Sequence, residues 1–415
     1  MNDELIIKGK NAKEASYQLM NISTEIKNKA LKKIADNLIM YSEKIIEKNK
    51  IDIDNSRNNG MSESMIDRLM LNEDRIKSIA EGVNQIADLD DPVGEILHMN
   101  KRPNGLVIGQ KRVPLGVIGI IYESRPNVTV DAAALCLKSS NSVILRGSKD
   151  AINSNKELVK IMKLSVKESG IDEGAIELIE DTSRETAEGF MKLNDYLNVL
   201  IPRGGAGLIR TAVEHATVPV IQTGIGNCHI FVDEYANLDM AYDILVNAKT
   251  SRVSVCNACE SLLVHRNIKD KFLPNAIKKL RDKNVEVRGC EETLKICKDV
   301  ILATEEDYGK EFLDYIISVK IVDDIKEAIE HINKYGTGHS ESIITESYTN
   351  SQTFLNEIDA AAVYVNASTR FTDGFEFGFG AEIGISTQKI HARGPMGLKE
   401  LTTTKYIIYG NGQIR

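Results

Sequence analysis

The first part of the chain, up to about residue 91, repeats apolar side chains at helical spacing. Between residues 30 and 39 the apolar positions fall on one face, and lysine and aspartate fall on the opposite face. These apolar positions are Ala30, Leu31, Ile34, Ala35, Leu38 and Ile39. Such spacing is typical of an amphipathic helix, so we expect this region to be helical.

From residue 117 onward, short β-branched runs alternate with helical patterns. The strand candidates are 117–121, 142–145 and 199–201, and the helix candidates are 130–138, 155–169 and 208–215. After Gly226 a second series has strands near 228–233, 261–265, 315–322, 342–345 and 361–366, with helices near 238–248, 270–283 and 324–335. This alternation predicts an α/β fold built on doubly wound parallel sheets.

Two further segments, 104–113 and 402–410, carry strand patterns outside the alternation. They predict a small separate sheet, shared between elements or between subunits. Because 415 residues exceed one ordinary core, we expect two or three domains.

Composition narrows the class of protein. Hydrophobic residues make up 42% and charged residues 27%, as in ordinary soluble proteins, and the net charge of −8 disfavours nucleic acid or an anionic membrane as partner. The apolar runs are strand-length and the N-terminus has no signal-peptide pattern, so we expect a cytoplasmic protein without membrane contact. Six scattered cysteines fit a reducing compartment better than a disulfide framework.

Two predicted strands end in glycine and a basic residue. One continues into Arg146, Gly147, Ser148 and Lys149, and the other into Arg203, Gly204 and Gly205. Open α/β sheets bind ligands at the carboxyl ends of their strands, where glycine turns offer backbone N–H groups to phosphate. Neither segment is a complete dinucleotide fingerprint, and a simple turn explains either one equally well.

Cys256 precedes an apolar strand and belongs to a Cys256-x-x-Cys259 pair. A thiolate is a strong nucleophile, yet most free cysteines in such places are small core residues. A redox pair is a further interpretation. A zinc site would need a second pair, and Cys290 and Cys297 are too far apart to supply it, so we expect no metal.

Several long motifs favour the interpretation of Cys256 as a nucleophile over its interpretation as a core residue. Residues 120–132, 255–258, 371–374, 379–387 and 391–403 resemble the glutamate-5-semialdehyde dehydrogenase family, also called γ-glutamyl phosphate reductases, within the aldehyde dehydrogenase superfamily. The resemblance implies a Rossmann-type NADP-binding domain (1–103 and 114–223), an α/β catalytic domain (224–400) and a β oligomerisation element (104–113 and 401–415).

The resemblance also implies an activity. It is the NADPH-dependent reduction of L-glutamyl 5-phosphate to L-glutamate 5-semialdehyde and phosphate in proline biosynthesis, through a thioester on Cys256. Asn127 and the Cys256 backbone N–H would stabilise the oxyanion, although Asn127 also suits a helix cap. The alternatives are an ordinary or CoA-acylating aldehyde dehydrogenase and, outside the enzymes, a thiol redox or metal-binding protein.

One departure from ordinary aldehyde dehydrogenases is informative. Where those enzymes carry a glutamate that activates water, this chain has Gln222. Glutamine is not a general base, which favours reduction of the thioester over its hydrolysis.

The same resemblance assigns ligand-binding residues. The cofactor would be NADPH, held by residues 146–149, by residues 203–205 and by Glu311, for which a surface position is an equal alternative. Arginine pairs with carboxylate and phosphate, so Arg125, Arg252, Arg370 and Arg393 are the candidates for substrate, although Arg393 equally suits a structural role. We expect a homodimer or higher homo-oligomer, with glutamate 5-kinase as a possible partner.

Overall fold

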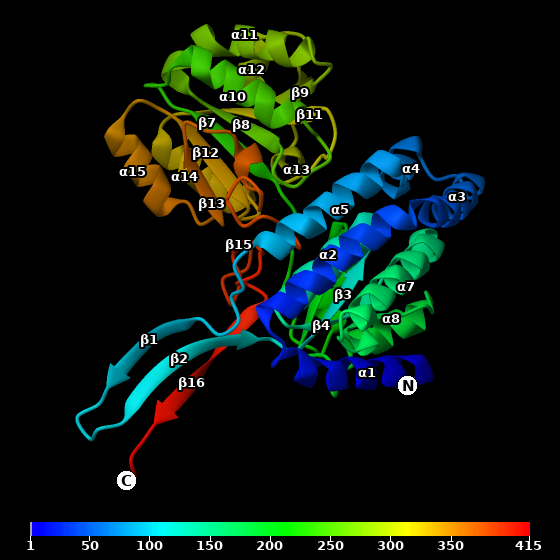
Figure 1. Ribbon diagram of the computed structural model, residues 1–415. Coiled ribbons are helices and arrows are strands. Elements are labelled where there is room, and N and C mark those ends of the chain that lie inside the picture. The colour runs from blue at the N-terminus through cyan, green and yellow to red at the C-terminus, as the bar shows by residue number, and fades with distance from the viewer. Residues whose placement is uncertain (1) are drawn as a thin grey trace. The chain divides into compact units, whose positions relative to one another are not determined.

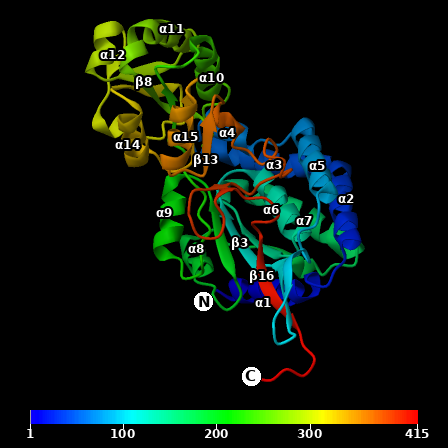
Figure 2. The same cartoon turned by 90° about the vertical axis from the view of Figure 1, so that its left-hand side faces the viewer.

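A computed structural model describes residues 2–415, which form two compact units (Figures 1 and 2). Unit 1 runs to Thr223 and includes two returning segments, Gly378–Gly384 and Met396–Arg415. Unit 2 consists of Gly224–Phe377 and Ile385–Pro395. Both contain parallel sheets between helices, so the predicted α/β class is confirmed.

Unit 1 is built on a four-stranded parallel sheet of order β5-β4-β3-β6. Its strands are β3 (Val117–Tyr122), β4 (Ser142–Arg146), β5 (Ile176–Leu178) and β6 (Val199–Arg203). β3 is buried along its whole length, as its unbroken apolar run predicts. The chain moves from β3 outward to β4 and β5 and then returns to the other side of β3, so the strand order reverses between β3 and β6.

Helices cover both faces of this sheet. They are α1 (Asp3–Leu19), α2 (Thr24–Met40), α3 (Ser42–Asn58), α4 (Glu63–Leu69), α5 (Glu73–Asp88), α6 (Pro126–Lys138), α7 (Ile152–Glu168), α8 (Arg184–Met191) and α9 (Ala206–His215), with short 3-10 turns at Lys149–Ala151 and Glu173–Ala175. Figure 2 shows α8 and α9 on one side of β3, and α6 and α7 on the other. The predicted N-terminal helices are present, and α2 buries Leu31, Ile34 and Leu38.

A three-stranded antiparallel arm extends away from the helices of unit 1 (Figure 1). Its order is β1 (Ile96–Lys101), β2 (Val107–Pro114) and β16 (Thr402–Tyr409). The sequence analysis gave the oligomerisation element as residues 104–113 and 401–415. It placed the residues of β1 in the cofactor domain, although β1 pairs with β2 in this sheet. Every residue of β1 is exposed in the chain described here.

Unit 2 is built on a seven-stranded parallel sheet of order β10-β9-β11-β8-β7-β12-β13. Its strands are β7 (Cys228–Val232), β8 (Cys259–His265), β9 (Glu286–Gly289), β10 (Ile301–Leu302), β11 (Ile316–Val322), β12 (Ser340–Ile344) and β13 (Ala362–Val365). Its helices are α10 (Leu238–Thr250), α11 (Lys269–Arg281), α12 (Glu291–Ile296), α13 (Glu305–Tyr308), α14 (Ile325–Tyr335) and α15 (Tyr348–Glu357), with 3-10 turns at Arg266–Ile268 and Thr369–Phe371. A short β14 (Ile385–Ser386) pairs with β15 (Gly394–Pro395).

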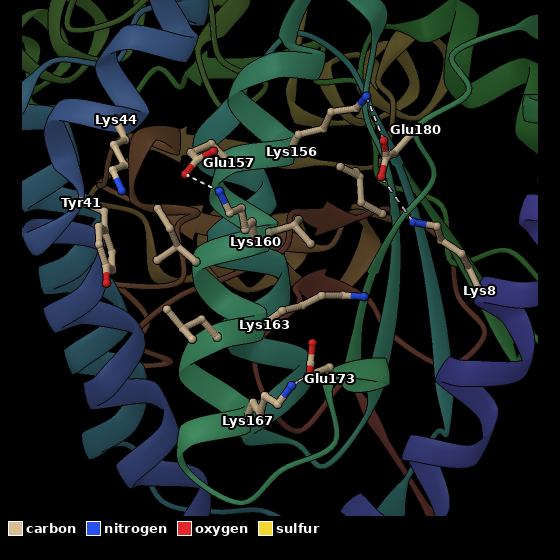
Figure 3. Close-up of a pocket in the computed structure, with 14 residues that line it drawn as sticks. Lys8, Tyr41, Lys44, Lys156, Glu157, Lys160, Lys163, Lys167, Glu173 and Glu180 are labelled. Carbon is tan, nitrogen blue, oxygen red and sulfur yellow. Dashed lines mark ion pairs between the residues drawn. The ribbon is translucent and has the colours of Figure 1, made fainter.

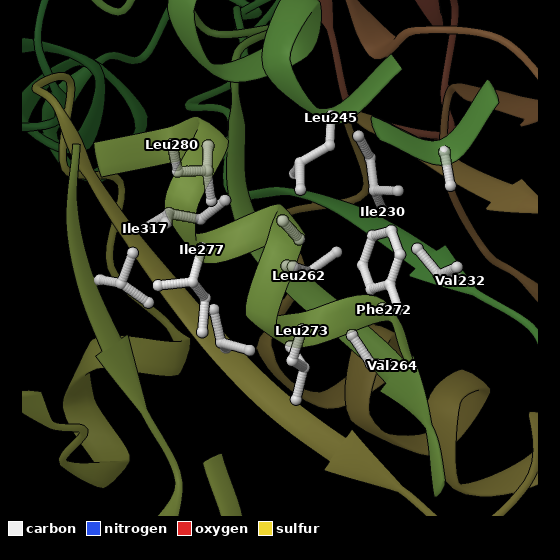
Figure 4. Close-up of a cluster of buried hydrophobic side chains, with 14 of the residues drawn as sticks. Ile230, Val232, Leu245, Leu262, Val264, Phe272, Leu273, Ile277, Leu280 and Ile317 are labelled. Carbon is white, nitrogen blue, oxygen red and sulfur yellow. The ribbon is translucent and has the colours of Figure 1, made fainter. Parts of the chain in front are cut away.

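The core of unit 2 lies on both faces of its sheet. On one face, strand residues such as Ile230 and Leu262 pack against Phe272, Leu273 and Ile277 of α11 (Figure 4). On the other, α14 and α15 cover a smaller cluster around Phe231 and Phe354. Within the described chain, no helix combines the length and the apolar character needed to span a bilayer.

Candidate active site

Cys256 lies in the turn that joins α10 to β8. The turn is closed by a hydrogen bond of 3.2 Å from the Ala258 N–H to the Val255 carbonyl oxygen. Cys256 itself is partly buried and is not in a disulfide. Partial exposure to solvent is a feature that reactive cysteines share.

The segment that enters β7 wraps closely around the Cys256 backbone. A Cβ on Gly226 would lie only 1.4 Å from the Cys256 carbonyl oxygen, so only glycine fits there. Two residues later, the thiol of Cys228 donates to the same oxygen at 3.2 Å. The carbonyl of the candidate nucleophile is therefore enclosed by one short stretch of chain.

Asn257, the next residue, is fixed by the segment after β13. Its carbonyl oxygen accepts from the Thr369 hydroxyl at 2.7 Å, and its side-chain amide donates to the Thr372 carbonyl at 2.9 Å. Its amide oxygen also accepts from the Arg370 guanidinium. Residues 256 and 257 are thus held from both sides.

Two of the predicted substrate arginines lie near this turn. The Arg370 guanidinium also donates through Nε to the Ser251 hydroxyl at 3.1 Å. Burial lowers the pKa of Arg370, and the positive charge of Arg252 nearby lowers it further. Two adjacent cations beside a thiol form a suitable place for an anionic substrate group.

Glu311 is connected to the same turn through Gly226, whose N–H donates to Glu311 Oε1 at 2.7 Å. Burial raises the pKa of this carboxyl, and the Gly226 hydrogen bond opposes that rise. Glu311 is partly buried and faces the nucleophile loop, so it is not the exposed surface residue that the sequence left as an alternative. Its assignment to the cofactor ribose stays a prediction.

In unit 1, the reversal of strand order places the carboxyl ends of β3 and β6 side by side. Ligand sites of open α/β sheets lie at such a reversal. Arg203 ends β6, and Gly204 and Gly205 lead directly into α9. The carboxylate of Glu123, just after β3, accepts from the Gly205 N–H at 2.9 Å. A Cβ on Gly204 would lie 2.7 Å from the carboxyl carbon of Glu123, so the glycine makes room for that close approach.

Asn127 lies at the same edge of unit 1, as the second residue of α6. The helix begins at Pro126 and not near residue 130 as expected, so Asn127 is inside it and is not its N-cap. Its amide donates to Asp131 Oδ2 at 3.1 Å. Burial raises the pKa of Asp131 to about 6, while the Asn127 bond and the charge of Arg203 oppose the rise.

The predicted residues that follow β4 have internal partners. Arg146 donates to the Thr182 and Ser183 carbonyls at 2.7 and 3.1 Å, and the Ser148 hydroxyl lies 3.2 Å from that of Ser124. A Cβ on Gly147 would lie 2.3 Å from the Asn155 amide nitrogen. The segment is therefore closely packed.

The N-terminus of α7, which follows Lys149, is occupied by the buried carboxylate of Asp52. That carboxylate accepts from the backbone N–H of Asn153 at 3.2 Å and of Ser154 at 2.8 Å. The N-terminus of α9 also contacts a carboxylate, but Glu123 is exposed and accepts from one backbone N–H there, whereas Asp52 is buried and accepts from two. A phosphate is therefore better served by the N-terminus of α9 than by that of α7.

Three further residues named from the sequence are Arg393, Arg125 and Gln222. Arg393 forms an ion pair of 2.8 Å with Asp359 in unit 2. Arg125 is the N-cap residue of α6 and is partly buried in unit 1. Gln222, also partly buried, comes just before the end of the first segment of unit 1.

Cys259 differs sharply from Cys256. It is fully buried on β8, its thiol donates to the Ser261 carbonyl at 3.4 Å, and burial raises its pKa to about 12. Among residues 2–415, no cluster of three or more His, Cys, Asp or Glu side chains is arranged to hold a metal ion. The burial of Cys259 disfavours the redox-pair interpretation.

A cavity of about 590 Å³ lies along α7 of unit 1 (Figure 3). Its wall carries six lysines, but most of them pair with glutamates, such as Lys156 with Glu180 at 2.8 Å. Its residues include neither the end of β6 nor the start of α9. The cavity therefore does not belong to the candidate site.

Comparison with known proteins places these features in a family. The model of the aldehyde dehydrogenase family matches residues 5–294 and 307–407. The chain belongs to the aldehyde dehydrogenase family. It is thus an oxidoreductase of a family that uses a nicotinamide cofactor, and the non-enzyme alternative is set aside.

Named relatives of this family are similar over the full length. A γ-glutamyl phosphate reductase from Clostridium perfringens (strain SM101 / Type A) is 66% identical over 415 residues, which is 100% of both chains. The crystal structure of a γ-glutamyl phosphate reductase from Thermotoga maritima is 53% identical with a TM-score of 0.97, covering 99% of this chain and 100% of that one. An acetylating aldehyde dehydrogenase from Geobacillus thermoglucosidasius shares the fold at 19% identity and a TM-score of 0.72, covering 100% of this chain and 98% of that one.

Two groups of predicted residues come together in the structure. Cys256, Arg252, Arg370 and Glu311 come together in unit 2, while Asn127 and residues 203–205 come together in unit 1. The sequence analysis missed Glu123, Gly226 and Cys228. For Glu123 a signal was available, since it directly follows a buried strand at the edge where ligands bind.

Proposed function

We propose that this chain catalyses the NADPH-dependent reduction of L-glutamyl 5-phosphate to L-glutamate 5-semialdehyde and phosphate, a step of proline biosynthesis. One observation carries the proposal: relatives named γ-glutamyl phosphate reductase are up to 66% identical and match the chain from end to end. The turn that presents Cys256 between two arginines and Glu311 supports it.

In the proposed reaction the Cys256 thiolate attacks the acyl carbon, the bond from carbon to the phosphate oxygen breaks, and phosphate leaves. A thioester remains. When bound, the reduced nicotinamide supplies the hydride that converts this thioester to a thiohemiacetal. The carbon–sulfur bond then breaks to release the aldehyde and restore the thiolate. We assign oxyanion stabilisation to the Asn127 amide and the Cys256 backbone N–H.

The residues of unit 1 fit a dinucleotide at the reversal between β3 and β6. Gly204 and Gly205 lie at the N-terminus of α9, where backbone N–H groups attract phosphate. Arg203 adds a positive charge beside them. Residues 146–149 stay candidates for the adenosine end, with Arg146 bonded to carbonyls and Lys149 in a short 3-10 turn.

For the substrate, Arg252 and Arg370 are the favoured partners of its phosphate and carboxylate groups, since they lie near Cys256 in the same unit. Arg125 stays a candidate from unit 1. Arg393 is the weakest of the four, because its guanidinium already pairs with Asp359.

An assay of the reverse reaction tests the proposal. Glutamate semialdehyde, NADP⁺ and phosphate should produce NADPH, and omission of phosphate should abolish the signal. Cys256→Ala should remove the activity, and Cys259→Ala, the matched control at a buried thiol, should keep most of it. Formation of glutamate without phosphate would instead favour an ordinary aldehyde dehydrogenase, and dependence on CoA would favour an acylating one.

Gln222 offers a second test of the same proposal. We expect Gln222→Glu to introduce a general base and divert part of the thioester to hydrolysis. Product analysis should then find some glutamate beside the semialdehyde. An unchanged ratio of products would argue against the alignment at this position.

The arm supports a proposed homodimer or higher oligomer. Tyr406 and Ile408 of β16 are 67% and 60% exposed, and exposed apolar patches commonly mark protein–protein contacts. Light scattering after size exclusion should report a dimer or larger species, and Ile408→Asp should shift it toward monomer. A cytoplasmic location and a glutamate 5-kinase partner stay part of the proposal.

A further inference from the structure

A second cysteine contacts the backbone of the candidate nucleophile. Cys228 is the first residue of β7 and is fully buried. β7 pairs with β8 so that Cys228 lies opposite Cys259, which brings the start of β7 beside the turn that carries Cys256. From there the Cys228 thiol donates to the Cys256 carbonyl oxygen at 3.2 Å.

The Cys228 thiol is suited to be a permanent donor. Burial raises its pKa well above the usual range, so it keeps its proton and does not compete as a nucleophile. Its single hydrogen has a second possible acceptor, Nδ1 of His339, but that atom is 3.7 Å away and lies 2.8 Å from the Ser340 hydroxyl. The Cys256 carbonyl is the closer acceptor.

A chain of hydrogen bonds holds the far side of this contact. The Ser340 hydroxyl lies 2.6 Å from that of Thr372, which lies 2.7 Å from the Tyr364 hydroxyl. Thr372 also accepts, through its carbonyl, from the Asn257 amide. The two residues of the 256–257 peptide are therefore held by groups that belong to one connected network.

We propose that Cys228 is a positioning residue for Cys256. By donating to its carbonyl oxygen, Cys228 fixes the 256–257 peptide plane and hence the direction in which Cβ and Sγ of Cys256 point. This inference rests on the proposed role of Cys256 as the nucleophile. Since Cys228 is fully buried and its thiol contacts the Cys256 carbonyl oxygen, we expect this contact to act on the chemical step and not on substrate affinity.

Three variants separate donation from packing. Cys228→Ser keeps a donor in a slightly smaller side chain, and we expect kcat within about threefold of wild type. Cys228→Ala and Cys228→Val lack a donor and bracket the thiol in size, and we expect each to lower kcat about tenfold with KM within twofold. Cys259→Ala, at an equally buried thiol on the neighbouring strand, is the matched control and should leave kcat unchanged.

An infrared measurement covers the case in which the donorless variants do not fold. Comparison of the infrared spectra of wild type and Cys228→Ser identifies the S–H stretching band of Cys228. We expect this band at a lower frequency than the band of a thiol that makes no hydrogen bond. A band at the unbonded frequency would overturn the proposal. So would equal losses in the Ser and Ala variants, or a loss confined to KM.

The Cys256→Ala variant distinguishes failure of the positioning role of Cys228 from failure of the proposed function. If Cys256→Ala retains activity, the nucleophile is wrong and Cys228 has nothing to position. If Cys256→Ala is inactive while Cys228→Ala has the wild-type kcat, the proposed function stands and the positioning role falls.

Discussion

Gly226→Ala is the sharpest perturbation available near Cys256. The added methyl would lie 1.4 Å from the Cys256 carbonyl oxygen, 2.3 Å from its carbonyl carbon and 2.7 Å from its Cα. All three atoms belong to the backbone, so no side-chain rotation relieves the overlap. Since carbon and oxygen normally stay about 3.3 Å apart, the two segments must separate by about 2 Å.

A shift of that size acts directly on the nucleophile. A misplacement of about 1 Å can cost roughly 100-fold in rate, so we expect kcat to fall at least about 100-fold. Overpacking should also lower the free energy of unfolding by about 1–3 kcal/mol. The rate is measured in the phosphate-dependent assay, and the free energy by urea unfolding of the full chain.

A glycine with open space supplies the control. Gly82 lies inside α5, and no heavy atom lies within 4 Å of where its Cβ would be. Gly82→Ala should leave kcat unchanged and raise the free energy of unfolding by up to about 1 kcal/mol. If Gly226→Ala keeps kcat within threefold of wild type, the close approach to Cys256 does not constrain the nucleophile as we argue.

Three further predictions concern charges. Because burial raises the pKa of Asp131 from 3.8 to about 6, the folded protein retains a proton that the unfolded chain loses between these values. As pH rises from about 4 to 6, wild type should therefore lose roughly 1–3 kcal/mol of unfolding free energy relative to Asp131→Asn. Parallel curves of unfolding free energy against pH for the two proteins would contradict this. Glu123→Ala removes the carboxylate that accepts from the Gly205 N–H, which leaves that N–H available to a cofactor phosphate. We therefore expect KM for NADPH to fall about 3–10-fold at constant kcat. A higher KM would mean that Glu123 itself binds the cofactor. Lys249 and Glu260 form a fully buried ion pair of 2.6 Å, so Lys249→Met should cost about 3–5 kcal/mol in urea unfolding, and adding Glu260→Gln should recover part of the loss. A cost below 1 kcal/mol for the single change would refute that reasoning.

The sequence predicts most elements of the fold where their apolar pattern is unbroken. β3 and β8 are buried along their whole lengths, and their apolar runs were recognised with small errors at the ends. β5 was missed because it has only three residues and carries Glu177 in its middle. That glutamate is tolerated since Lys163 of α7 pairs with it at 2.7 Å, a contact between two elements that the pattern within β5 does not reveal.

The candidate site likewise contains residues that the sequence identifies and residues that it does not. Residues with reactive or charged side chains, such as Cys256 and Arg370, could be named from motifs. Gly226 and Cys228 could not, because their importance depends on how β7 and β8 pair and on how closely two backbones approach. Proximity of this kind depends on strand register, which one sequence does not specify.

The arm has a consequence for how the protein is made. β16 lies near the end of the chain but pairs with β2, and the Gln110 amide donates to the Thr404 hydroxyl across 294 positions. Unit 2, almost entirely the continuous stretch Gly224–Phe377, emerges from the ribosome before β16 does. One edge of β2 must therefore wait unpaired while more than half of the chain is synthesised. Unpaired strand edges invite association with other chains, so a nascent or C-terminally truncated chain is the form most exposed to aggregation.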